Sequence, residues 1–450
     1  ILLGTQANDL GTSALVFGGT KTNIQDVSLR NTNAGAVLPS FTGLTNLRNL
    51  TLTFNNAAIA FPALTLTNSG NLSATAGGAI TQSGILTVPG TASFTAGANP
   101  ITLTQNNLLT GAVTLSNSGA NDVSLTNNQA LVLAASSLGR NLTIVAAGDI
   151  TQTGALTVPG TSSFSAGANN ITLTQSNAFT GAVSLANSGA KDVSVTNSGA
   201  LLIGTSSIGR NLSLTAGGSI SQNGVITAAG GTNTVAVTAA GSDILLGSFA
   251  NDLGGNALVF GGTKSNIQDI SLRNTNAGAV LPSFTGLTNL RNLTLVFNNA
   301  GMSFPAVTLT NSGNLSATAG GAISQTGVIT VPGTASFTAG ANPITLTQNN
   351  LFTGAVTLSN SGANDVSLTN NQALVLAASA IGRNLSVIAA GDITQTGALT
   401  VPGTSSFSAG ANNITLTQSN ALTGAVSLAN SGVKDVSVTN SGALVIGTSS

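Results

Sequence analysis

The sequence lacks most of the residue types from which catalytic and metal sites are built. Its 450 residues contain no His and no Cys, which excludes Ser-His-Asp and Cys-His nucleophiles and zinc sites made of imidazole or thiolate. The absence of Cys also rules out disulfides and leaves the redox compartment open. Every acidic residue is Asp, so any enzyme in this chain would have to be built on aspartate.

Charge is scarce and balanced. Eleven Lys and Arg residues match eleven Asp residues, and the net charge is zero. A chain without a basic face cannot release the counterions of a phosphate backbone, so nucleic acid is not an expected partner. Although 42% of the residues are hydrophobic, no run approaches the roughly 18 unbroken apolar residues of a membrane helix.

Strong helix formers are also rare. Glu is absent and Lys is scarce, whereas Thr, Val, Ile, Asn and Gly are abundant. The first three of these favour strands, and Asn and Gly favour turns. The composition therefore predicts an all-β fold.

The residues that are present form a repeat of 70. A stretch that begins NLSATAGGAI at Asn71 returns in related form at Asn141 and Asn211. Periodicity on this scale indicates a solenoid or a repeat array and takes precedence over any short motif.

A longer repeat of 243 residues lies on top of the first. The stretch recurs from Asn314 and Asn384, so residues 1–243 form one long repeat and 244–450 an incomplete second one. The two copies differ at roughly two dozen positions, mostly by Ile/Val/Leu or Ser/Thr exchanges. Such exchanges preserve shape, so we expect residues 1–450 to form one continuous domain.

Short runs inside the repeat alternate between apolar and polar residues. ITLTQ at 101–105, AVTLS at 112–116 and DVSLT at 122–126 are separated by turns rich in Gly and Asn. This period of two is typical of half-buried strands. Three strands and three turns take roughly 20 to 29 residues, so we divide the repeat into coils at 71–90, 91–111 and 112–140.

These runs predict a parallel β-solenoid of about 18–19 coils, each of 20–31 residues. Its interior should hold stacked aliphatic side chains together with Phe94, Phe164 and Phe337. A propeller fits less well because its blades need about 40 to 50 residues. The segment LTNLRNLTL is similar to a leucine-rich repeat but occurs once per long repeat, so we interpret it as a longer β-coil.

The aspartates do not form a predicted catalytic group. Asp122 and Asp192 occupy equivalent places three coils apart in our division, about 14 Å, which is too far for a carboxylate pair. Asp149 and Asp392, and likewise Asp9 and Asp252, have the sequence surroundings of turn residues.

The basic residues also have structural interpretations. The Arg of the recurring GRNL segments closes a coil, where it can bind turn carbonyls or stand in solvent; these residues are Arg140, Arg210 and Arg383. The neighbours Lys191–Asp192 and Lys434–Asp435 should point to opposite faces of a strand and form at most a weak pair.

Two surface features have functional alternatives. Asn49, Asn71, Asn141 and Asn211 match the glycosylation sequon, but at such turns we favour a ladder of hydrogen bonds. The TxT runs Thr51–Thr53, Thr65–Thr67 and Thr102–Thr104 raise ice binding. A single flat rank of Thr would favour ice binding, and a mixed coat of Ser, Thr and Asn would favour a filament.

The repeats resemble those of a known family. NLSATAGGAITQSG, TVPGTASFTAGANPITLTQ and TGAVSLANSGAKDVSVTNSGALLIGTSS are similar to the filamentous-haemagglutinin-like repeats of very large bacterial surface proteins exported by two-partner secretion. The resemblance implies a right-handed β-helix, a cell-surface or secreted location, and an adhesive or scaffolding role.

We therefore expect a structural extracellular fibre or adhesin stalk that spaces and adheres cells or builds a biofilm matrix. No catalytic, cofactor-binding or metal residues are predicted, and no cofactor. The expected partners are other copies of the chain, end to end or laterally, cell or abiotic surfaces, and an outer-membrane export partner, with no nucleic acid and no small-molecule substrate. A carbohydrate-active or ice-binding β-helix surface is the alternative.

Overall fold

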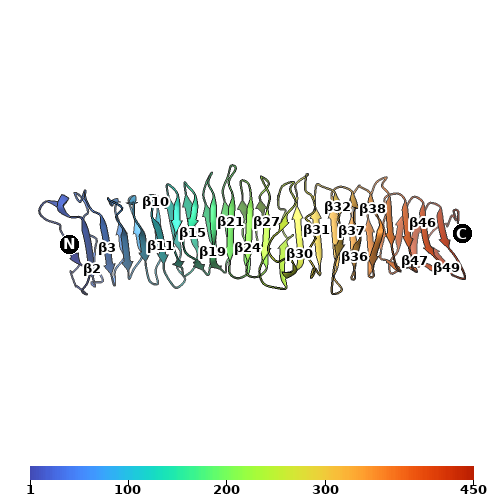
Figure 1. Cartoon of the computed structure of the whole chain (residues 1–450), viewed down its shortest axis with the longest axis horizontal. Helices are drawn as coiled ribbons and strands as arrows, with labels where there is room; N and C mark the ends of the chain where they lie inside the picture. Colours follow the sequence, from blue (N-terminus) through green and yellow to red (C-terminus); the bar gives the residue numbers. More distant parts are fainter. The chain divides into compact units, whose positions relative to one another are not determined.

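The computed structural model describes residues 1–450 and consists of β-strands, turns and two short 3-10 helices. No helix has the length and apolar character needed to cross a membrane. The chain is a parallel β-solenoid of about 20 coils, which confirms the predicted fold class. It divides into two compact units, Ile1–Gly217 (unit 1) and Gly218–Ser450 (unit 2). In Figure 1 the strands within each unit stack on one another in the order of the sequence.

Each coil has two sides that differ in shape. One side is usually a straight strand of four to six residues, and the other is a corner pair, meaning two short strands in succession or one nine-residue strand that bends. Tight turns join the sides, and the glycines predicted there are confirmed at Gly97 and Gly119, with φ of 53° and 65°.

The straight strands of unit 1 are β2 (Asp26–Asn31), β3 (Asn49–Phe54), β6 (Leu72–Ala76), β9 (Ala92–Thr95), β11 (Ala112–Ser116), β12 (Val123–Asn127), β15 (Leu142–Ala146), β18 (Ser162–Ser165), β20 (Val183–Ala186), β21 (Val193–Asn197) and β24 (Leu212–Ala216). The corner pairs are β4 (Ile59–Phe61) with β5 (Leu64–Thr65), β7 (Ile80–Gln82) with β8 (Leu86–Val88), β10 (Ile101–Leu109), β13 (Leu131–Leu133) with β14 (Ser136–Ser137), β16 (Ile150–Gln152) with β17 (Leu156–Val158), β19 (Ile171–Phe179) and β22 (Leu201–Ile203) with β23 (Ser206–Ser207). The remaining elements are β1 (Leu2–Leu3) and the 3-10 helix η1 (Lys21–Asn23).

Unit 2 repeats the same architecture. Its straight strands are β27 (Thr234–Val237), β30 (Ile267–Asn274), β31 (Leu293–Phe297), β34 (Leu315–Ala319), β37 (Ala335–Thr338), β39 (Ala355–Ser359), β40 (Val366–Asn370), β43 (Leu385–Ala389), β46 (Ser405–Gly410), β48 (Val426–Asn430) and β49 (Val436–Asn440). The corner pairs are β25 (Ile220–Gln222) with β26 (Ile226–Thr227), β32 (Met302–Phe304) with β33 (Val307–Thr308), β35 (Ile323–Gln325) with β36 (Ile329–Val331), β38 (Ile344–Phe352), β41 (Leu374–Leu376) with β42 (Ser379–Ala380), β44 (Ile393–Gln395) with β45 (Leu399–Val401), and β47 (Ile414–Leu422). The others are β28 (Ser242–Leu246), β29 (Val259–Phe260) and the 3-10 helix η2 (Lys264–Asn266).

The 70-residue repeat holds three and a half coils. From β6 to β14 the chain passes seven sides, because the straight strands β11 and β12 follow each other without a corner pair between them. Leu72 therefore lies in one sheet, paired with Ala92, whereas its equivalent Leu142 lies in another sheet, paired with Val123. Successive repeats are thus related by half a turn about the solenoid axis.

This arrangement corrects our division of the repeat. The segment 112–140 is not one coil, because β13 stacks directly on β11, with Val113 paired to Leu133. A coil takes as few as 19 residues, between Val123 and Leu142. The sequence pattern shows where strands occur, but the hydrogen-bonded register decides on which side of the coil each one stacks.

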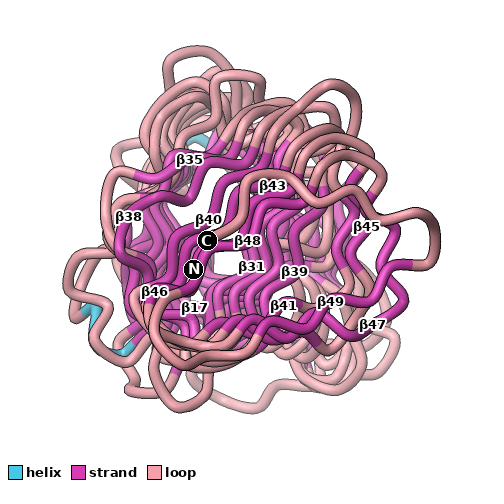
Figure 2. The backbone as a smooth tube through the Cα atoms, turned by 90° about the vertical axis from the view of Figure 1, so that its right-hand side faces the viewer, coloured by secondary structure: helices cyan, strands magenta, loops and turns pink.

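The interior is a continuous apolar stack inside each unit. Phe94, Phe164 and Phe337 have no exposed surface, which confirms their predicted inward orientation. The ring of Phe94 meets that of Phe61 edge to face, with centroids 6.3 Å apart. Figure 2 shows the strands as the walls of the coils and the turns at the outside. Without disulfides, this burial contributes most of the stability, at roughly 25 cal/mol per Å² of apolar surface.

Buried amides hold the corners of the coils. The Asn107 side chain is fully buried where β10 bends, at a shift in register between Leu103 and Asn107. Its Oδ1 accepts hydrogen bonds from Gln82 Nε2 at 2.8 Å and from Leu86 N at 2.9 Å. Its Nδ2 donates to the carbonyl of Leu103 at 3.1 Å and that of Thr126 at 3.0 Å. One side chain thus satisfies polar groups from three successive coils.

We call the pair of a Gln side chain and the buried Asn that it binds a Gln–Asn bracket. The bracket recurs at four more bends, as Gln152–Asn177, Gln222–Asn251, Gln325–Asn350 and Gln395–Asn420. Sequence analysis missed it because Asn in a run such as TQNNL has the appearance of a turn residue. A Gln 25 residues before a buried Asn, as at 82 and 107, marks four of these brackets, whereas Gln222 and Asn251 lie 29 residues apart.

We predict that Asn107→Leu destabilises unit 1 by about 3 kcal/mol or more. Leu has a similar volume but leaves the amide of Leu86 and the carbonyls of Leu103 and Thr126 buried without a partner, each at about 1–3 kcal/mol. Asn106→Leu, at the exposed neighbouring position, should change stability by no more than about 0.5 kcal/mol. Guanidinium unfolding and hydrogen exchange would measure both variants, and equal effects would contradict the bracket's role.

One core position carries an unsatisfied hydroxyl. Ser162 is 1% exposed and its Oγ has no hydrogen-bond partner, as is also true of Ser405 in unit 2. The equivalent residue in the preceding repeat is Ala92, also 1% exposed. We predict that Ser162→Ala stabilises the chain by about 1 kcal/mol, since it removes a buried unpaired hydroxyl without leaving a large cavity. The reverse change, Ala92→Ser, should lower the thermal midpoint, and a lower midpoint for Ser162→Ala would refute the argument.

Candidate functional site

Polar side chains at the start of the straight strands link each coil to the next. In unit 1 the Oδ1 of Asp26 accepts the amide of Asn49 at 3.3 Å, and the Oδ1 of Asn49 accepts that of Asn71 at 3.0 Å. The Oδ1 of Asn71 in turn accepts the amide of Thr91 at 2.7 Å. The predicted Asn ladder is therefore present, with Asp and Thr among its members. Asn141 takes part in the same way on another sheet, where its Oδ1 accepts the amide of Thr161 at 2.8 Å.

The arginines of the GRNL segments form ion pairs with aspartates of the same ladder. Arg140 binds Asp122 of the preceding coil with both Nε and a terminal nitrogen, each at 2.7 Å. Our expectation that these arginines bind turn carbonyls was wrong, but the alternative that they stand in solvent holds in part, since half of the Arg140 side chain is exposed. Asp192–Arg210 and Asp365–Arg383 repeat the geometry. The hydrogen bond from Arg140 holds the pKa of Asp122 below its ordinary value, although half-exposed side chains make such a pair worth little stability.

Asp122 and Asp192 lie on different sides of the solenoid, which corrects our placement of them at equivalent places three coils apart. Asp122 precedes β12 and Asp192 precedes β21, and these strands belong to different sheets because the repeat contains half a turn. The two carboxylates therefore do not face each other. Lys191 and Lys434 form no ion pair with the neighbouring Asp, and Asp192 pairs with Arg210 instead.

The remaining predicted turn aspartates have turn or ladder roles. Asp9 Oδ1 accepts the amide of Gly11 at 2.9 Å, and Asp252 Oδ1 accepts that of Gly254 at 3.1 Å. Asp149 Oδ1 accepts the amide of Asn170 at 2.8 Å. Asp392 does the same for Asn413, also at 2.8 Å. These contacts support a structural role for each of the four residues.

Unit 2 contains one carboxylate pair that sequence analysis missed. Asp243 and Asp269 lie on successive coils, and Asp243 Oδ1 accepts the amide of Asp269 at 3.2 Å. Asp269 also binds Arg291, whose Nε lies 3.0 Å from its Oδ1. Partial burial, and then the charge of Asp269, raise the pKa of Asp243. The spacing of 26 residues between the two aspartates, one long coil, could have revealed the pair only if the coil length were known.

Hydroxyl groups predominate on the outer face of the straight strands. In unit 1 one outward column runs through Ser28, Thr51, Ser73, Ser93 and Thr114, one residue from each successive coil. A parallel column contains Thr53, Thr75, Thr95 and Ser116. In unit 2 the position of Thr53 is occupied by Val296. The columns mix Ser and Thr, so they form a hydroxyl coat and not a single rank of Thr.

Taken together, these contacts link each coil to its neighbours. Most of the aspartates bind backbone amides of their own turn or amides and arginines of neighbouring coils. The outward strand positions carry mainly Ser and Thr, with Arg30 and Val145 among the exceptions. No group of three or more Asp side chains could hold a metal ion. The surface can form many weak, neutral contacts along successive coils.

We predict that Asp243→Asn raises the thermal midpoint at pH 7. An acid whose pKa is raised on folding favours the folded state below its ordinary value of 3.8, and loses that contribution as the pH rises through the folded-state value. Asn keeps the acceptor for the amide of Asp269 without the charge. The gain over wild type should shrink between pH 7 and pH 3. Asp243→Ala, which removes the acceptor, should show no such gain, and a pH-independent effect of Asp243→Asn would contradict the charge argument.

Comparison with known proteins places the repeats in one family. No curated protein and no solved structure matches the chain. A family model described as repeats of unknown function (DUF5649) matches residues 47–116, 120–186, 190–260, 290–359 and 363–429. The matches cover about three quarters of the chain, and their lengths agree with the 70-residue period. The chain therefore belongs to the family of DUF5649 repeats.

Proposed function

We propose that the chain is a structural module of a large bacterial surface protein, in which the number of repeats sets length and the outer faces provide adhesion. The family of origin would be the filamentous-haemagglutinin-like proteins, exported by two-partner secretion through an outer-membrane partner. The location would be extracellular or at the cell surface. Its partners would be other copies of the chain and cell or abiotic surfaces.

The observation that carries this proposal is that polar side chains of different types occupy different places. Asp, Arg and the ladder Asn bind between coils, as in Asp122–Arg140, and so stabilise the stack. The outward strand positions carry Ser and Thr in columns that run from coil to coil. A repeated neutral surface supports many weak contacts whose strengths combine by multivalency.

The exchanges between the long repeats support the same role. They are mostly apolar for apolar, as at Leu138 and Ile381, which are both buried, or Ser for Thr. Such changes preserve the stack and leave no unique polar cluster in one copy that would mark a dedicated catalytic site. We therefore infer that the module acts without catalysis and without a cofactor.

The half-turn between repeats matters for adhesion. Within unit 1, β6 and its equivalent β15 lie in different sheets, so the same surface motif faces alternate directions in successive repeats. A fibre built this way can contact neighbours on opposite sides. This geometry suits a matrix component more than a binder with one active face.

We predict that charge placed in the hydroxyl column abolishes adhesion. The variant Thr51→Lys, Ser73→Lys, Ser93→Lys adds three like charges to adjacent coils of one face. Beads coated with it should aggregate or adhere at least about tenfold less than beads coated with the wild-type chain, because the weak contacts act together. The measurement is bead clustering and retention on a surface at physiological salt.

The matched control carries the same charge in the turns. Ala98→Lys, Ala120→Lys, Ala168→Lys changes three exposed turn residues and should keep adhesion within about twofold of wild type. Circular dichroism should show that both variants fold. Equal loss in both variants would indicate a general charge effect, and no loss in either would refute adhesion through the column.

A further inference from the structure

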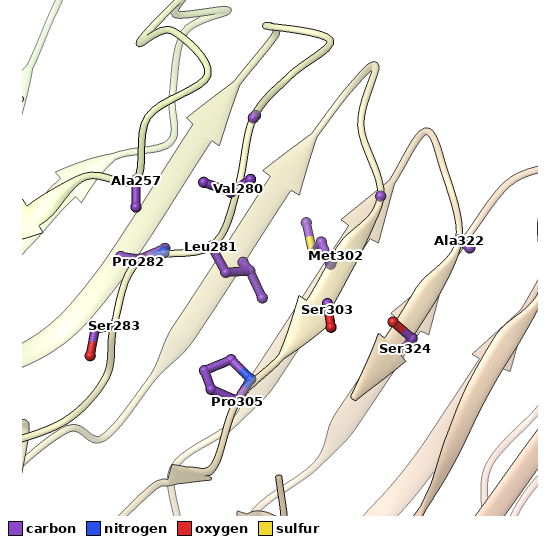
Figure 3. Close-up of a pocket in the computed structure, with 12 residues that line it drawn as sticks. Ala257, Val280, Leu281, Pro282, Ser283, Met302, Ser303, Pro305, Ala322 and Ser324 are labelled. Carbon is purple, nitrogen blue, oxygen red and sulfur yellow. The ribbon is translucent and has the colours of Figure 1, made fainter. Parts of the chain in front are cut away.

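Each unit has an apolar groove beside the first corner pair that follows the LPSF segment. In unit 1 a groove of about 630 Å³ lies between the loop residues Val37, Leu38 and Pro39 and the strand-side residues Ala60 and Pro62. The equivalent groove of unit 2 has the same volume and lies between Val280–Ser283 and the segment 301–305. Figure 3 shows Val280, Leu281 and Pro282 on one wall and Met302, Ser303 and Pro305 on the other.

The strand that forms one wall is paired on one side only. β4 pairs with β7 of the next coil, and β32 pairs with β35, and neither has a second strand partner. The amide of Ile59 donates to Ala79 O at 2.9 Å, and the carbonyl of Phe61 accepts from Ser83 N at 2.8 Å. Successive residues of a strand direct their amide and carbonyl groups to opposite edges. The amide and carbonyl of Ala60 therefore point away from β7, toward the groove.

The same geometry holds in unit 2. The amide of Met302 donates to Ala322 O at 2.9 Å, and the carbonyl of Phe304 accepts from Thr326 N at 2.7 Å. The amide and carbonyl of Ser303, between them, are directed to the open edge. Ala60 and Ser303 are both exposed.

The preceding coil explains why this edge is open. Between β2 and β3 the chain forms no strand, and the loop instead inserts Phe41, Leu44 and Leu47 into the core. These side chains close the interior, so the coil needs no strand on this side. The backbone of the loop does not continue the hydrogen bonds of the sheet, so a strand edge stays unpaired inside the unit and not only at its end.

The lining of the groove defines what fits. None of its residues is charged, so a charged strand would lose hydration without gaining a partner. The long repeats differ at the strand wall, where Ala58, Ile59 and Ala60 become Gly301, Met302 and Ser303. These exchanges leave the wall uncharged and the groove volume unchanged.

We propose that each groove is an acceptor for an extended, uncharged peptide segment of a partner protein, which adds a strand to the free edge of β4 or β32. The incoming backbone would bind the amide and carbonyl of Ala60 or Ser303, and its alternate small or β-branched side chains would contact the loop wall. Main-chain hydrogen bonds supply affinity in this mode of recognition, and side-chain pockets supply selectivity. Pro62 and Pro305, which lack an amide hydrogen, limit the added strand to a few residues.

The test uses the full chain with one fluorophore at Ser40→Cys, which is a unique attachment site because the chain has no cysteine. The probe is the capped peptide Ser-Val-Thr-Val-Ser with a 13C carbonyl. We expect saturable binding, and an infrared shift of the labelled carbonyl to the position typical of a β-sheet.

Ala60→Lys, which places a charge on the edge, should weaken binding at unit 1 about tenfold or more. Thr102→Lys, an exposed position on a fully paired strand, should leave binding unchanged.

Three outcomes would overturn the proposal. One is that the peptide fails to bind the wild-type chain. Another is that a peptide with N-methylated amides binds equally well, which would indicate an apolar groove without strand addition. The last is that the groove is occupied by a second copy of the chain, seen as dimerisation that Ala60→Lys and Ser303→Lys abolish and the peptide does not displace. Adhesion through the hydroxyl column is measured on different residues, so it can fail or succeed independently.

Discussion

The buried Gln–Asn bracket, which occurs at five bends of the chain, is the interaction on which the rest of the solenoid depends. A coil of about 20 residues must turn sharply around an apolar interior, and a bend interrupts the hydrogen bonds of the strand that makes it. Asn107 replaces those bonds with its own amide and binds to Gln82 of the preceding coil and to Thr126 of the next. Because the bracket spans three coils, the bends must stay in register, and the straight strands between them then stack in register as well.

Ladders of hydrogen-bonded side chains also link successive coils at the surface. Asp and Asn side chains accept the backbone amides of the next coil, and arginines close the ladder at Asp122, Asp192 and Asp365. The outer strand faces carry mainly neutral hydroxyl groups, and this is the physical basis for proposing a structural and adhesive role in a family described as repeats of unknown function.

The long repeat adds one irregularity to this regular stack. Where the LPSF loop replaces a strand, Phe41 and its apolar neighbours complete the core but the ladder of hydrogen bonds stops. A regular array of 70-residue repeats would have no open strand edge between its ends. The long repeat places one in each unit, which gives an otherwise uniform surface a local feature that a partner could recognise.

The sequence by itself determined the fold class, the inward Phe residues and the places of the turns, because alternation of apolar and polar residues and the positions of Gly and Asn are local properties of the chain. It also excluded sites that are built on His or Cys, since both residues are absent. It could not decide on which side of a coil each strand stacks, because register depends on hydrogen bonds between residues some 20 positions apart. The half-turn between repeats, the partnership of Arg140 with Asp122, the buried bracket at Asn107 and the open edge at Ala60 all follow from that register. Only the tertiary structure could reveal them, because each one joins residues of different coils or depends on how those coils pair.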